Sequence, residues 1–181
     1  DAVRNSLCAR FSLSLYKIYI QTIQRIQTIY LAVSMILLSI VATGSEVFRF
    51  VGNDFYFVFN SYGISQYANS STSGKAEVVN AYPFYISLIA IVLLLFVTLM
   101  AYKNLSRQLK LVRIVFFLYL LLTIALVVFS FIGENQFEGG PFKRELGLGY
   151  LLFVLGLPFV FLANISIKRD KGLIDSLNRL R

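Results

Sequence analysis

One long apolar run limits what this chain can fold into. Leu111–Ile132 reads LVRIVFFLYLLLTIALVVFSFI, about 22 residues whose single charge, Arg113, lies within a turn of the start. At about 1.5 Å per residue, a helix of this length crosses a hydrocarbon core of about 30 Å. No face of the run is polar, which excludes an amphipathic soluble helix, and a strand of this length would be abnormal. The run therefore predicts a transmembrane helix.

Three further apolar runs repeat the pattern: Gln27–Gly44, Phe84–Tyr102 and Gly147–Ile167. The chain is 57% hydrophobic and only 14% charged, whereas soluble domains carry roughly 25% charged residues. We therefore predict an all-α membrane protein, a four-helix transmembrane bundle with spans at about 27–44, 84–102, 111–132 and 147–167. Pro158 should kink the fourth span, which shapes packing more often than it serves gating.

The connection between the first two spans has the composition of strands. Val47–Val51 and Phe55–Asn60 are aromatic and β-branched and flank a Gly52-Asn53-Asp54 turn signal. We expect an antiparallel hairpin here, a Ser/Asn/Gly loop over Tyr67–Lys75, and a third short strand at Ala76–Asn80. Together they predict a small β-rich extracytoplasmic cap on the bundle.

Five phenylalanines of the predicted hairpin are candidates for a cap surface. Two interpretations remain open for these side chains: packing on the outer end of the bundle or in the interfacial aromatic belt, which is favoured, or an exposed aromatic surface that grips a partner. The residues are Phe48, Phe50, Phe55, Phe57 and Phe59.

Basic residues set the predicted orientation. Thirteen of the 17 lie in the N-terminal segment, around the short Lys103–Lys110 connector or in the C-terminal tail. The positive-inside rule then places both termini in the cytoplasm. The tail carries Leu173, Ile174, Leu177 and Leu180 at helical spacing, which predicts a short amphipathic helix. Residues 133–146, between spans three and four, are expected to form a turn-rich loop.

The composition argues against several chemistries. Histidine is absent and Cys8 is the only cysteine, which argues against metal sites built on His or Cys clusters and against an internal disulfide. No ionisable group lies at mid-span, where catalysis or ion coupling would need one. We expect no enzyme activity, no cofactor and no metal. The net charge of +8 is explained by membrane topology rather than by nucleic-acid binding.

Polar residues at the cytoplasmic side form a candidate docking surface for a partner or for lipid headgroups. Two glutamines three residues apart share a helix face and could bond to a partner's backbone, although simple interface anchoring is the favoured alternative. The candidates are Gln24, Arg25, Gln27, Arg107, Arg113, Arg179 and Arg181.

Two stretches carry a family resemblance: IQRIQTIYL at Ile23–Leu31 and KRDKGLIDSLNRLR at the end of the chain. With four spans between them, they resemble the bacterial domain-of-unknown-function family 4293, small inner-membrane proteins typical of the Bacteroidota. That resemblance implies topology and location, and it supplies no activity. Thr22 stands where the family's initiator Met would be. Residues 1–22 are therefore expected to be additional to the membrane domain at 23–181, as a basic extension with an interfacial helix or as an upstream translation of the reading frame.

The leading functional expectation is a non-enzymatic accessory or scaffold subunit of a membrane complex, in contact with lipids and a membrane-protein partner or a second copy. The alternative is a small oligomeric transporter or channel for an uncharged or lipid-like solute. A membrane enzyme that uses Tyr, Ser or Glu at the rim is the weakest hypothesis.

Overall fold

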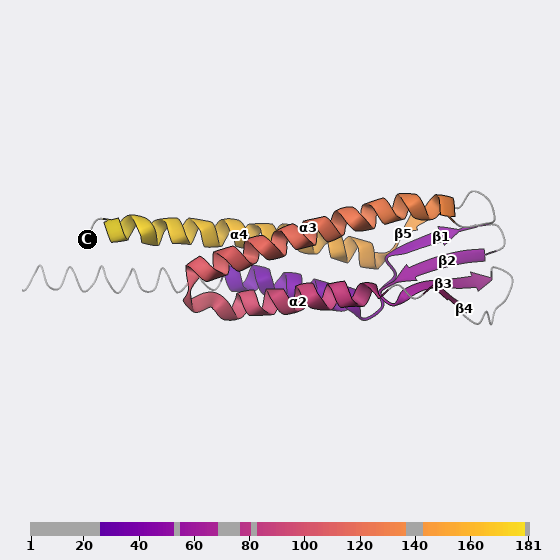
Figure 1. The fold of residues 1–181 in the computed structure, drawn as a ribbon, viewed down its shortest axis with the longest axis horizontal. Coiled ribbons are helices and arrows are strands. Elements are labelled where there is room, and N and C mark those ends of the chain that lie inside the picture. The colour runs from indigo at the N-terminus through magenta and orange to yellow at the C-terminus, as the bar shows by residue number, and fades with distance from the viewer. Residues whose placement is uncertain (1–25, 53–54, 69–76, 81–82, 137–142, 180–181) are drawn as a thin grey trace, which may run out of the picture.

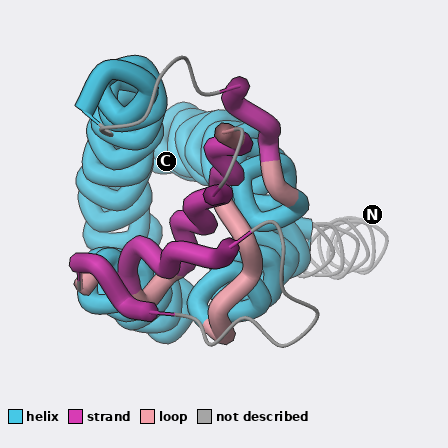
Figure 2. Tube along the Cα trace, turned by 90° about the vertical axis from the view of Figure 1, so that its right-hand side faces the viewer, coloured by secondary structure: helices cyan, strands magenta, loops and turns pink. Residues whose placement is uncertain are grey.

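The computed structural model describes residues 26–52, 55–68, 77–80, 83–136 and 143–179. Its helices run along one long axis, and a small antiparallel sheet lies at one end of them (Figure 1). We call this the sheet end and the opposite end, where α2 turns into α3 and α4 finishes, the distal end. Viewed from the sheet side, the strands cross in front of the helix ends (Figure 2).

All four predicted runs are helical. They form a helix at Ile26–Ala42, then α2 (Phe84–Met100, followed by the 3-10 turn η1 at Ala101–Lys103), α3 (Leu105–Gln136) and α4 (Leu148–Arg179). Three of the helices are long and apolar enough to cross a membrane, over 20, 28 and 29 residues, and the described part of the first helix is shorter. These properties indicate a membrane protein.

Two boundaries differ from the sequence prediction. The expected connector at Lys103–Lys110 is largely helical, because α3 begins at Leu105. Its first turn closes on the Asn104 carbonyl, which accepts hydrogen bonds from the Arg107 and Gln108 amides. The tail is also not a separate short helix, because α4 continues from its apolar part through Pro158 and the charged tail to Arg179.

The sheet has five strands in the order β4-β3-β2-β1-β5. The predicted hairpin is confirmed: β1 (Phe48–Val51) pairs antiparallel with β2 (Phe55–Asn60), with Phe48 opposite Phe59. The strand predicted at Ala76–Asn80 is β4 (Glu77–Asn80). The cap is therefore β-rich, as expected.

Two strands were not predicted. β3 (Gly63–Ala68) takes up the start of the expected loop and pairs with β2. The turn between them is an Asn turn, in which the Asn60 side-chain oxygen accepts hydrogen bonds from the Tyr62 and Gly63 amides, and Gly63 has a φ of +149°. β5 (Lys143–Leu146), expected as part of a loop, adds to the free edge of β1.

Backbone hydrogen bonds attach the sheet directly to the helices. The Gly147 amide donates to the Val47 carbonyl at 2.9 Å, and the Gly149 amide donates to the Glu46 carbonyl at 2.8 Å. These contacts fix the start of α4 against the segment that leads into β1. Ser61 makes a second attachment, because its hydroxyl donates to the Val41 carbonyl and its own carbonyl accepts the Tyr85 amide.

The helices pack through one buried stripe on each. In the first helix this stripe is Gln27, Leu31, Ser34, Leu38 and Val41, the three- and four-residue spacing of a single helix face. The stripe meets α4 at Ser34, whose hydroxyl lies close to Gly156. Beside the stripe, the Tyr30 and Phe159 rings lie 6.5 Å apart. At the sheet end, aromatic contacts join the helices to one another. For example, the rings of Phe84 in α2 and Phe153 in α4 lie 6.2 Å apart.

Candidate functional site

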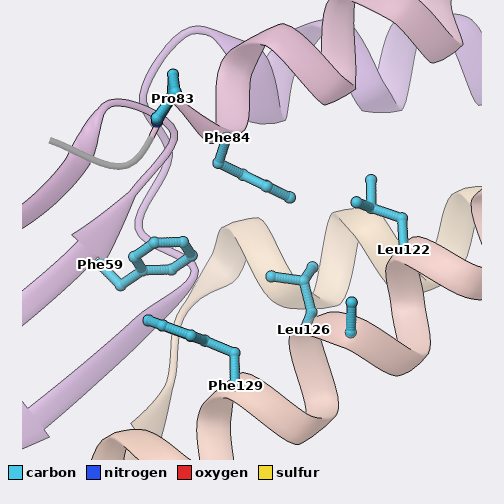
Figure 3. A pocket seen from close by; sticks show the side chains of 7 residues that line it. Phe59, Pro83, Phe84, Leu122, Leu126 and Phe129 are labelled. Carbon is cyan, nitrogen blue, oxygen red and sulfur yellow. The ribbon is translucent and has the colours of Figure 1, made fainter.

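An apolar groove lies where the sheet meets α2 and α3. It has a volume of about 330 Å³, and all of its lining side chains are apolar (Figure 3): Phe59, Pro83, Phe84, Leu122, Ala125, Leu126 and Phe129. It lies where α2 and α3, which are joined by a tight turn at the distal end, diverge towards the sheet (Figure 1). The groove can therefore hold an apolar group and offers no side chain that would hydrogen-bond to it.

The local sequence explains why the groove forms here. Pro83 precedes the first residue of α2, where its fixed backbone angle suits a helix start. The bond from the Tyr85 amide to the Ser61 carbonyl then holds this start beside the end of β2. As a result, Phe59 from the sheet and Phe84 from α2 come together, with ring centroids 5.9 Å apart.

The groove has a buried floor and an exposed rim. Phe59 and Leu126 are each only 4% exposed, and the Phe59 and Phe129 rings lie 4.9 Å apart. Pro83 and Ala125, in contrast, are exposed. The groove therefore opens on the outer surface of the helices, and a group that enters it would come from the surroundings of the helices rather than from the protein interior.

The predicted cap phenylalanines divide into two groups. Phe48, Phe50, Phe57 and Phe59 are buried, and only Phe55 is exposed, at 46%. The packing interpretation therefore holds for four of the five, and the idea of an exposed five-residue aromatic surface is wrong. Alternation places the four buried rings on the face of the sheet that packs on the helix ends, where Phe48 meets Tyr150 at 5.1 Å. Phe55 has the same alternation, but it begins β2, at the end of the strand opposite to Phe59, so its exposure follows from its place along the strand.

Only three of the predicted docking side chains, those of Gln27, Arg107 and Arg113, lie in the described part of the chain. Gln27 is only 2% exposed and is buried between the helices, so it does not belong to a docking surface. Arg107 and Arg113 are exposed on α3. Gln24, Arg25 and Arg181 lie outside the described residues, as does the side chain of Arg179 in α4.

Four side-chain atoms in the described part of the chain are buried without a hydrogen-bond partner: Gln27 Nε2, Ser34 Oγ, Asn164 Oδ1 and Asp170 Oδ2. The burial of the Asn164 and Asp170 atoms was not expected from the sequence. The signal that would have found it is the helical spacing of these two residues with the buried apolar residues of α4. The four atoms do not gather into a metal site, since no group of three His, Cys, Asp or Glu in the described parts of the chain could hold an ion.

Replacing Ser34 with alanine tests whether its buried hydroxyl is purely structural. Since the hydroxyl has no partner, Ser34→Ala should leave the free energy of unfolding within about 1 kcal/mol of the parent or raise it. Reversible unfolding in mixed detergent micelles, followed by circular dichroism, measures this. A larger destabilisation would show that the hydroxyl has a partner in the folded protein.

The fold and the groove define a class of protein. It is a mostly helical protein with a small antiparallel sheet, three helices that are long and apolar enough to cross a membrane, and an apolar groove where the sheet meets the helices. Within this class the chain belongs to the family described as "Domain of unknown function (DUF4293)", whose model matches residues 23–180. This match confirms the resemblance seen at the two ends of the sequence. No functionally curated protein matches the chain.

Proposed function

We propose that this protein is a non-enzymatic, four-pass accessory subunit of a bacterial inner-membrane complex, and that its apolar groove receives side chains of a partner's transmembrane helix. The helix at Ile26–Ala42 would be the first span, in addition to the three formed by α2, α3 and α4. Its described part is about 26 Å long. The sheet lies outside the cytoplasm in this arrangement, and both termini lie inside.

Charge supports this orientation. The distal end carries a run of basic residues on α3 and α4, including Lys110, Arg113, Lys168 and Arg169. The described residues at the sheet end mix both signs, and Arg49 there pairs with Glu46 at 2.7 Å. An excess of Lys and Arg at one end of apolar helices is the pattern of a cytoplasmic face.

The groove is the observation that carries the docking proposal. Exposed apolar side chains alone would not, because lipid covers them on any membrane helix. The groove is a concave site lined by seven apolar residues, two of which form its buried floor. It therefore gives a partner side chain van der Waals contacts on several sides. Such packing drives the association of helices in a membrane, where the hydrophobic effect between them is lost.

The same groove favours one second candidate, the transport of an uncharged or lipid-like solute. Its lining is entirely apolar and its rim at Ala125 faces outward, so an acyl chain could enter from the bilayer. A path through four helices of one copy would leave little room, and this function would require an oligomer.

A filled groove tests the docking proposal. Ala125→Trp places a large side chain over the groove, and it should weaken retention of a stoichiometric partner about tenfold or more, since packing contacts worth about 1.4 kcal/mol or more are lost. A photoreactive residue at position 122, in the groove lining, first identifies the partner by cross-linking. The amount of this partner that co-purifies in mild detergent is then compared between the variants. Ile124→Trp is the matched control, because Ile124 is 55% exposed on the same helix and does not line the groove.

Each result has a defined meaning. Loss of the partner with Ala125→Trp but not with Ile124→Trp supports docking in the groove. Cross-links from position 122 only to lipid, in a protein that purifies as a lone homo-oligomer, would overturn the accessory function and favour transport.

A further inference from the structure

A second cavity, of about 330 Å³, lies at the distal end between the start of α3 and the last third of α4. We call it the basic pocket. It is separate from the apolar groove, and its lining is polar and basic on one side and apolar at Leu105 and Ile174. The lining residues are Lys103, Asn104, Leu105, Ser106, Arg107, Lys171, Ile174 and Asp175.

Three cations from two sides of the cavity converge on it. Lys103 comes from η1 and Arg107 from the first turn of α3, and Lys171 comes from α4. None of the three forms an ion pair with a carboxylate among the described residues; the Lys103 ammonium lies 6.0 Å from the centre of the Tyr102 ring. Asp175 is the one acidic residue in the lining, so the pocket keeps a positive charge that can attract an anion.

The start of α3 adds backbone donors to this charge. The Arg107 and Gln108 amides donate to the Asn104 carbonyl, whereas the amides of Leu105 and Ser106 come earlier in the first turn, where a helix has no internal acceptor for them. The positive end of the helix dipole and these amide groups favour an anion. The Ser106 hydroxyl in the lining is a further donor.

The position of the pocket indicates where its anion comes from. Met100 at the end of α2 and Tyr102 in η1 precede it in the chain and are both about half exposed. Leu105 and Ile174 continue this apolar surface into the pocket. A ligand here would have an anionic head beside three cations and apolar chains along the helices. Basic pockets between transmembrane helices on the cytoplasmic side bind anionic lipid headgroups in this way.

We propose that the basic pocket binds the phosphate group of an anionic phospholipid from the cytoplasmic leaflet, held by Lys103, Arg107 and Lys171 and by the amides at the start of α3. This site rests on the membrane insertion given under the proposed function, and it does not depend on the groove or on any partner protein.

Native mass spectrometry of the full chain tests the site. The protein is released from nanodiscs that contain phosphatidylglycerol and phosphatidylethanolamine in equal amounts, and the retained lipids are counted. The parent should retain phosphatidylglycerol preferentially. Lys103→Gln/Arg107→Gln/Lys171→Gln should lower the affinity for phosphatidylglycerol about tenfold or more.

Two further variants make the test specific. Lys110→Gln/Lys168→Gln/Arg169→Gln removes three exposed cations at the same end that do not line the pocket, and retention should stay within about twofold. Asp175→Asn removes the acid from the lining and should strengthen retention about twofold to fivefold, a gain that misfolding cannot imitate.

Three results would overturn the site: equal loss of phosphatidylglycerol in both triple variants, no gain with Asp175→Asn, or full competition by inorganic phosphate, which would make the ligand a free anion. In each case normal insertion of the variants into the bilayer would leave the proposed membrane function intact. Failure of the parent to insert would instead remove that function.

Discussion

Gly147→Ala is expected to loosen the sheet from the helices and to lower the free energy of unfolding by about 3 kcal/mol or more. A Cβ atom at Gly147 would lie 2.2 Å from the Glu46 carbonyl oxygen and 2.7 Å from the Glu46 carbonyl carbon. Both are backbone atoms, so no side-chain rotation relieves the overlap. The Gly147 amide also donates to the Val47 carbonyl here. The segments around Glu46 and Gly147 therefore cannot move apart without breaking that bond.

Hydrogen–deuterium exchange of the purified protein measures the local effect, and detergent-induced unfolding measures the global one. In Gly147→Ala, the amides of residues 46–50 and 143–150 should exchange faster than in the parent. Gly172→Ala is the matched control, since nothing lies within 4 Å of a Cβ atom built there. A helical Gly→Ala change should stabilise the protein by about 0.5–1 kcal/mol. Equal behaviour of the two variants would contradict the close contact at Gly147.

The helices could be predicted from the sequence because a membrane span needs only length and continuous hydrophobicity. Phe84–Met100 and the apolar part of Leu105–Gln136 satisfy both, and no tertiary contact is needed to recognise them. The start of α3 was missed for the same reason, because Leu105–Lys110 is helical but charged, and hydropathy does not distinguish a charged helix from a loop. The tail was predicted to be helical, but its continuity with the fourth span was not.

Strand pairing depends on partners that are distant in the sequence. The β1–β2 hairpin was predictable from its own alternation and turn. β5, with the sequence KREL, has no strand signal of its own and becomes a strand because β1 presents a free edge to it, with Phe48 opposite Leu146. The contact between Glu46 and Gly147 that places β5 there joins residues that are far apart in the chain.

The candidate sites show the same division. The sequence indicated that basic residues gather at one side of the membrane, but it could not show that Lys103, Arg107 and Lys171 line one cavity, because this requires the packing of α3 on α4. The groove is equally hidden, since Phe59 and Ala125 reach it from different elements. Gln27 shows the opposite error: its polarity suggested a surface role, and its place in the buried stripe overrides that.

Gly156→Ala should be the second strongly destabilising change, by about 2–3 kcal/mol, and its effect should depend on Tyr119. A Cβ atom at Gly156 would lie 2.2 Å from the Tyr119 hydroxyl oxygen, whereas the next ring atom, Cζ, is 3.3 Å away. That hydroxyl donates to the Phe153 carbonyl, in the turn of α4 that precedes Pro158. Pro158 leaves the Val154 carbonyl without its helical donor, and the Tyr119 bond is made to the neighbouring Phe153 carbonyl, in the same turn of α4.

Tyr119→Phe removes the hydroxyl and should cost about 1–2 kcal/mol through the lost hydrogen bond. The double variant Tyr119→Phe/Gly156→Ala should then be less destabilised than the sum of the two single changes, by about 1–3 kcal/mol, because the new methyl group occupies the space that the hydroxyl has left. Unfolding free energies of the four proteins complete the cycle. Tyr119→Phe combined with Gly172→Ala should be additive, because the two positions share no contact. Additivity in the Gly156 cycle as well would show that the Tyr119 hydroxyl does not lie against Gly156.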